Sequence, residues 1–190
     1  KEGAKAEKQL LAKVREYGMR CVGPNCLGVV NTHPDIRMDG CFAESLPERG
    51  NIGFVSQSGA LGGGILNILK DLNLGFAQFI SIGNQADVNA ETALEYWENE
   101  EDVEQILLYM ESIQNPANFR KLASRISKKK PILALKAGRS AAGASAASSH
   151  TGSLAGADKA ANALLNQSGV IREYSLQDLF ATAKVFANCP

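Results

Sequence analysis

The sequence has few of the residues that bind metal ions and no long hydrophobic run. It contains two histidines and four cysteines, and none of the cysteines, Cys21, Cys26, Cys41 and Cys189, forms a CxxC pair. A structural zinc site, or any other metal site, is therefore not predicted. No apolar run approaches the ~20 residues that cross a bilayer. The scattered cysteines and the lack of a recognisable signal peptide predict a cytoplasmic protein.

Net charge is also absent, because the 20 Lys and Arg residues balance the 20 Asp and Glu residues. This balance argues against a nucleic-acid-binding surface or a polybasic membrane patch. Hydrophobic residues make up 45% of the 190 residues and charged residues 21%, which favours a packed core over disorder. We therefore expect small molecules or other protein domains as partners, and a length that fits one full domain and part of another.

From residue 51 onwards, short apolar segments alternate with amphipathic ones. Strands are predicted at 51–56, 75–82, 103–110, 131–136 and 170–173, and helices at 58–72, 90–99, 115–127, 155–168 and from 175 onwards. This alternation indicates an α/β protein with a parallel sheet covered on both faces. Five such strands predict a flavodoxin-like, doubly wound fold.

The first fifty residues are less regular. A helix is predicted at 4–15, ending before Gly18, and a short strand near 19–22. Residues 31–50 are rich in turn formers and are interpreted as a connection between domains. Because the sequence starts and ends within predicted helices, we expect the natural chain to continue at both ends.

The segment 56–64 follows the first strand of the regular region and is unusually rich in serine and glycine. Ser58 and Gly59 would stand at the start of a helix, where unpaired backbone N–H groups can hold an anion. The segment matches neither the Walker A nor the G-x-G-x-x-G pattern. A serine cap with glycines that let the helix pack on the sheet explains the composition equally well.

Two further residues could take part in chemistry. His150 lies among small hydroxyl and glycine residues after the low-complexity segment 140–149, so its imidazole would be accessible as a nucleophile. Glu111 ends a wholly apolar strand and could orient an imidazole by accepting its other N–H. Taken one at a time, a loop histidine without a role and a solvent-facing glutamate are the more common cases.

Four segments in order resemble a known family. They are 23–31 (GPNCLGVVN), 50–62 (GNIGFVSQSGALG), 81–84 (SIGN) and 148–156 (SSHTGSLAG). With them the chain resembles the α subunit, or α-like half, of NDP-forming acyl-CoA synthetases, such as ADP-forming acetyl-CoA synthetases, in the succinyl-CoA synthetase superfamily. The resemblance covers essentially the whole chain, and four segments in register are far more specific than any one of them.

The resemblance implies three regions and a set of site residues. Residues 1–46 would be the C-terminal part of a Rossmann-like CoA-binding domain with its linker, 47–174 a succinyl-CoA synthetase-like ligase domain, and 175–190 the start of a following domain. His150 would carry the phosphoryl group and Glu111 would orient it. The remaining implied residues are Ser56, Ser58, Gly59, Thr151 and Gly152 for phosphate, and Asn25, Cys26, Gly83 and Asn84 near CoA or the substrate.

The implied reaction converts acyl-CoA, phosphate and NDP into acid, CoA and NTP through a phosphohistidine. CoA and phosphate would bind here, whereas ADP or ATP with Mg²⁺ would bind an ATP-grasp domain or β subunit that the sequence lacks, within an oligomeric enzyme. The fragment alone is therefore expected to be inactive. Alternatives are the ligase-like region of a protein lysine acetyltransferase, in which we would not expect the histidine, and a non-catalytic acyl-CoA-sensing module.

Overall fold

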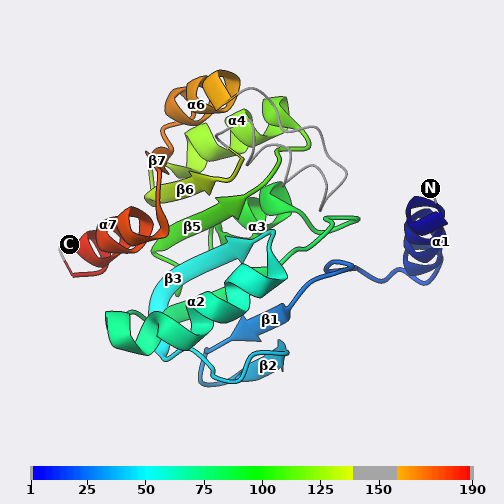
Figure 1. Cartoon of the computed structure of the whole chain (residues 1–190), viewed down its shortest axis with the longest axis horizontal. Coiled ribbons are helices and arrows are strands. Elements are labelled where there is room, and N and C mark those ends of the chain that lie inside the picture. Colours follow the sequence, from blue (N-terminus) through cyan, green and yellow to red (C-terminus); the bar gives the residue numbers. More distant parts are fainter. Residues whose placement is uncertain (1, 139–157, 189–190) are drawn as a thin grey trace.

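A seven-stranded sheet forms the centre of the computed structural model, which describes residues 2–138 and 158–188 (Figure 1). The strand order is β2-β1-β4-β3-β5-β6-β7. Five of the strands run parallel: β3 (Arg49–Ser56), β4 (Phe76–Ser81), β5 (Gln105–Met110), β6 (Ile132–Lys136) and β7 (Ile171–Glu173). Numbered along the chain, these five strands have the order 2-1-3-4-5, so the predicted flavodoxin-like arrangement is confirmed.

The predicted connection at 31–50 is wrong in part, because a β-hairpin occupies its first half. Strand β1 (Gly28–Asn31) pairs antiparallel with β2 (Met38–Cys41) and also with β4. Residues that we had assigned to the end of a preceding domain thus extend this sheet. The hairpin was missed because both strands have four residues and β2 is largely exposed, which leaves no alternating apolar pattern to detect.

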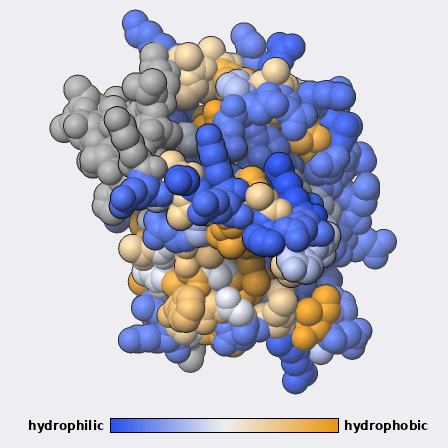
Figure 2. Space-filling model, turned by 90° about the vertical axis from the view of Figure 1, so that its right-hand side faces the viewer, coloured by the Kyte–Doolittle hydropathy of each residue, from blue (hydrophilic) through white to orange (hydrophobic). Residues whose placement is uncertain are grey.

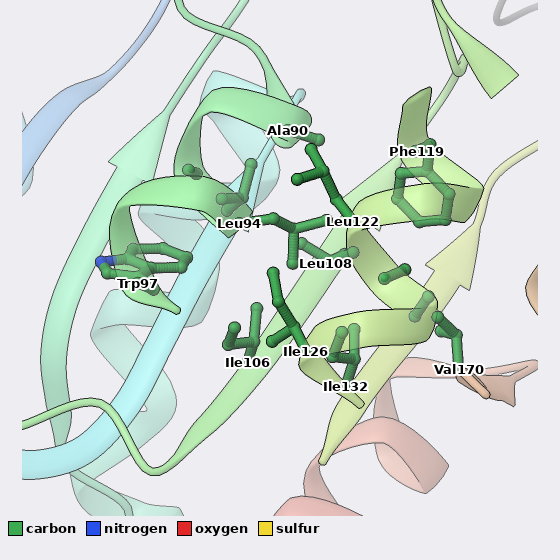
Figure 3. Packing of buried hydrophobic residues seen from close by; sticks show 14 of the residues in the cluster. Ala90, Leu94, Trp97, Ile106, Leu108, Phe119, Leu122, Ile126, Ile132 and Val170 are labelled. Carbon is green, nitrogen blue, oxygen red and sulfur yellow. The ribbon is translucent and has the colours of Figure 1, made fainter. Parts of the chain in front are cut away.

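Helices cover both faces of the sheet, as predicted. On one face lie α3 (Ala90–Trp97), α4 (Pro116–Ile126) and α6 (Asp158–Gln167). Apolar side chains of α3 and α4 pack against those of β5 and β6 (Figure 3), and Leu165 of α6 belongs to the same cluster. On the other face lie α2 (Gly59–Leu72) and α7 (Leu176–Asn188). The four central parallel strands, β3 to β6, are largely buried on both sides, which explains their mostly apolar sequences.

Aromatic rings fill the core beneath α2 and α7. The ring of Phe54 lies 5.4 Å from that of Phe76, 5.7 Å from that of Phe79 and 6.4 Å from that of Phe180. Phe180 belongs to α7, the helix that we expected to lead into a following domain. In this structure α7 buries its apolar face against the same sheet as α2.

The chain before the sheet begins with α1 (Glu2–Glu16), of which only Val14 is buried. In Figure 1 this helix lies on the side toward which the parallel strands point. The strand predicted near residues 19–22 is wrong. These residues lie beside the loop after β4 and make isolated hydrogen bonds to it, such as Val88 N–H to Cys21 O (3.1 Å), without forming a strand ladder. Within the described residues, no helix is long and apolar enough to cross a membrane.

Candidate functional site

Strand β3 ends at Ser56, and a serine-rich turn connects it to α2. The Ser56 hydroxyl donates to Ser58 O (2.8 Å) and accepts from Ser58 N–H (3.2 Å), so this buried serine shapes the turn. The Ser58 hydroxyl accepts from Leu61 N–H (3.3 Å) and caps the helix. The N–H groups of the first helical turn therefore point out of the carboxyl edge of the sheet, where an anion can bind.

The segment 21–28 lies along the loop after β4. Asn84 N–H donates to Pro24 O (2.9 Å), and Ala86 N–H donates to Gly23 O (3.0 Å). Gly83 has a φ of +48°, and a Cβ at this position would lie 2.3 Å from Pro24 O. Only glycine fits this approach, which brings two of the recognised sequence segments together although they are some sixty residues apart.

The two segments and the turn enclose one cavity of about 440 Å³. The predicted residues that line it are Asn25, Cys26, Ser58, Gly59, Gly83, Asn84 and Glu111. The cavity thus joins residues that were predicted separately for phosphate, for CoA and for catalysis. Ser56 does not line it. Figure 2 shows the side of the molecule toward which the parallel strands point, where hydrophobic residues are exposed between hydrophilic ones.

Gln57 lines the same cavity and was not predicted. Its side-chain Oε1 accepts hydrogen bonds from Glu111 N–H (2.7 Å) and Ser112 N–H (2.9 Å), and its Nε2 donates to Ser112 O (2.7 Å). Its own N–H donates to Tyr109 O (3.1 Å). The only signal in the sequence was the position of Gln57 between Ser56 and Ser58, which does not reveal a partner on another strand.

The electrostatics of the cavity rest on backbone dipoles and one carboxylate. No lysine or arginine of the described chain lines the cavity, so an anion there would depend on the N–H groups of α2. Burial raises the pKa of the Cys26 thiol, which favours the neutral form. Burial and the charge of Glu111 raise the pKa of Tyr109, a neighbour in β5.

Three predicted residues, His150, Thr151 and Gly152, lie outside the described residues. The strand that precedes them is described, however. Lys136, the last residue of β6, is the partner of Met110 in β5, and Ala137 N–H donates to Met110 O (2.8 Å). The chain therefore leaves β6 beside the residue that precedes Glu111, at the edge of the sheet where the cavity opens.

Residues 49–186 match the family model described as "Succinyl-CoA ligase like flavodoxin domain". The chain is 42% identical over 184 residues to the ADP-forming acetate–CoA ligase of Methanocaldococcus jannaschii, which covers 97% of this chain and 26% of that protein. It is 42% identical to the α subunit of the ADP-forming acetate–CoA ligase II of Pyrococcus furiosus, covering 97% of this chain and 40% of the subunit.

A solved structure agrees with these matches. The dinucleotide-forming acetyl-coenzyme A synthetase 1 of Ca. Korarchaeum cryptofilum, in complex with phosphate and ADP, superposes with a TM-score of 0.91 at 35% identity, over 98% of this chain and 40% of that one. The chain thus spans between about a quarter and two fifths of the length of these relatives. By the family match over most of its length, the chain belongs to the family of succinyl-CoA ligase-like flavodoxin domains.

Proposed function

We propose that this chain is the phosphoryl-transfer part of an NDP-forming acyl-CoA synthetase. One observation carries the proposal: a single cavity brings together the helix start at Ser58 and Gly59, the carboxylate-bearing residue Glu111, and the pairs Asn25–Cys26 and Gly83–Asn84. The relatives that are named as ADP-forming ligases support the same reaction. None of these names favours a lysine acetyltransferase or a sensing module.

The reaction would proceed in three group transfers, two at this site and the third at another site. Phosphate held at the start of α2 attacks the acyl carbonyl of acyl-CoA, which forms an acyl phosphate and releases CoA as its thiol. The His150 imidazole then attacks the phosphorus, and the acid leaves as a carboxylate. Glu111 accepts the other imidazole N–H and stabilises the charge that develops on the ring. Phosphohistidine finally transfers the phosphoryl group to NDP.

The remaining parts of the enzyme follow from this scheme. NDP and Mg²⁺ would bind an ATP-grasp domain or β subunit, as the family resemblance implies for an enzyme of which this chain spans about a quarter to two fifths. We propose that residues 1–46 lead from a CoA-binding domain into the ligase domain at 47–174, whose sheet the β1–β2 hairpin extends, and that 175–190, with α7 packed on that sheet, lead on to a further domain. Within the described chain the three cysteines are free, which suits a reducing cytoplasm.

Labelling the complete enzyme with γ-labelled ATP and Mg²⁺ tests the proposal. We expect an acid-labile, base-stable phosphate on His150 that is discharged by CoA together with the acid. His150→Asn should abolish the label. His33→Asn is the matched control, since His33 lies in the turn between β1 and β2 and should label as the wild type does. Equal labelling of His150→Asn and the wild type would refute the assignment.

A further inference from the structure

The side-chain amide of Gln57 connects the start of α2 to the loop after β5. Gln57 is 5% exposed, and its amide makes three hydrogen bonds, at 2.7, 2.7 and 2.9 Å, with backbone groups of Glu111 and Ser112. Its backbone N–H makes a fourth bond to Tyr109 O. The next residue along the chain is Ser58, the cap of α2. Gln57 thereby fixes the backbone of Glu111 relative to the first turn of α2.

We infer that Gln57 is a positioning residue for phosphoryl transfer, which sets the carboxylate of Glu111 at the correct distance from an anion held by α2. This inference rests on the proposed function. It adds a residue that is distinct from the groups that would touch the phosphoryl group, because the Gln57 amide acts through the backbone of Glu111. Small errors in the placement of a catalytic group are costly: about 1 Å can reduce a rate on the order of 100-fold.

An amide suits this position because it must donate and accept at once. Oε1 faces two N–H donors, whereas Nε2 faces the Ser112 carbonyl oxygen. A carboxylate here would lose the donor and place an oxygen against that carbonyl oxygen. When protonated, however, the introduced carboxyl group could donate again and restore all three bonds. Methionine has a similar length and would remove all three.

The test measures phosphohistidine formation and steady-state turnover in the complete enzyme. For Gln57→Met we expect labelling and kcat to fall on the order of 10- to 100-fold. KM for acyl-CoA should change much less than kcat, because the amide of Gln57 bonds only backbone groups of Glu111 and Ser112. For Gln57→Glu we expect the rate relative to wild type to rise as the pH is lowered, since protonation restores the donor. The pH readout also holds if the methionine variant does not fold.

Two controls separate positioning from a general loss of stability. Gln78→Met alters another buried glutamine, 7% exposed, which bonds Trp97 Nε1–H (2.9 Å) in the middle of the sheet. It should lower the melting temperature and leave the labelling rate unchanged. In a Glu111→Gln background, Gln57→Met should cause little further loss, because residues that act as one unit are not additive.

The outcomes distinguish this inference from the function on which it rests. Wild-type labelling by both Gln57 variants at every pH, with no labelling of His150→Asn, would overturn the positioning role and keep the proposed function. An equal loss of rate in Gln78→Met, or a fully additive loss in the Glu111→Gln background, would also overturn it. Labelling of His150→Asn would instead refute the proposed function.

Discussion

The Leu27 N–H donates a hydrogen bond to the hydroxyl oxygen of Ser81 at 2.9 Å. Ser81 is the last residue of β4 and is fully buried. Leu27 belongs to the segment 23–31, which contributes Asn25, Cys26 and Leu27 to the lining of the cavity. This one bond joins two sequence segments on which the family resemblance rests. It also places Asn25 and Cys26 over the carboxyl edge of the parallel sheet.

Ser81→Ala should therefore destabilise the protein more than the loss of an exposed hydroxyl does. The variant leaves the N–H of Leu27 without its acceptor in a partly buried position, which costs about 1–3 kcal/mol. Ser45→Ala is the control, because Ser45 makes an exposed hydrogen bond to Asn67 and should change stability by less than about 0.5 kcal/mol. Urea unfolding compares the two, and equal effects would contradict the role given to Ser81.

Two glycine-to-alanine variants should shift stability in opposite directions. Gly83→Ala forces a Cβ to within 2.3 Å of Pro24 O at a positive φ, so we expect a loss of about 1–3 kcal/mol. Gly64 lies within α2, and a Cβ there meets nothing within 4 Å. Gly64→Ala should stabilise by up to about 1 kcal/mol through helix propensity. Denaturant midpoints measure both, and a neutral Gly83→Ala would show that the two segments are not in contact.

Phe180→Ala tests whether α7 belongs to the core of this sheet. Phe180 is 4% exposed and its ring meets that of Phe54 edge to face, so its truncation should cost about 3–5 kcal/mol. Val185, in the same helix, is 58% exposed, and Val185→Ala should have little effect. Hydrogen exchange of the β3 amides measures the stability of the sheet. If α7 instead belonged to a separate domain, neither variant would change the protection of these amides.

Replacing Glu91 with glutamine should increase the stability of the protein in a pH-dependent way. It is buried in the first turn of α3, its Oε1 accepts from Asn115 N–H (3.4 Å), and burial raises the pKa of its carboxyl group. Ionisation of Glu91 therefore destabilises the folded state relative to the unfolded one. Glu91→Gln should be more stable than wild type at pH 8, and the gain should shrink as the pH falls through the native pKa of Glu91 and vanish below about pH 4.

Urea unfolding at pH 8, 6 and 3 measures this difference. At the lowest pH the carboxyl group is neutral in both the folded and the unfolded chain, so the two proteins should have similar stability. A difference that stays constant across the range would mean that burial of the charge is not its cause.

The central parallel strands were predictable because they are largely buried on both faces and are therefore mostly apolar. The strands at 51–56, 103–110 and 131–136, and the helices between them, were placed to within a few residues. The β1–β2 hairpin was not, since Met38, Asp39 and Gly40 are exposed and carry no periodic signal. Residues 19–22 were mistaken for a strand; Cys21 instead bonds the loop after β4, and no strand forms there.

The site was predictable to the extent that the carboxyl ends of parallel strands meet at one edge. Ser58 and Glu111 follow neighbouring strands, so their proximity follows from topology alone. Gln57 was missed because its amide partners are backbone groups, and their identity depends on the β3–β5 register. His150 lies outside the described residues, so its assignment stays a prediction.

The hairpin has one further consequence, for how the protein behaves in concentrated solution. If β1 and β2 were absent, β4 would form the margin of the sheet and would offer an apolar strand with unpaired backbone groups to other molecules. The edge strand on this side of the sheet is instead β2, which is four residues long, largely exposed, and contains Asp39 and Gly40. Short edge strands that carry a charged residue discourage pairing with other molecules, so we expect the hairpin to protect β4 from strand-to-strand self-association.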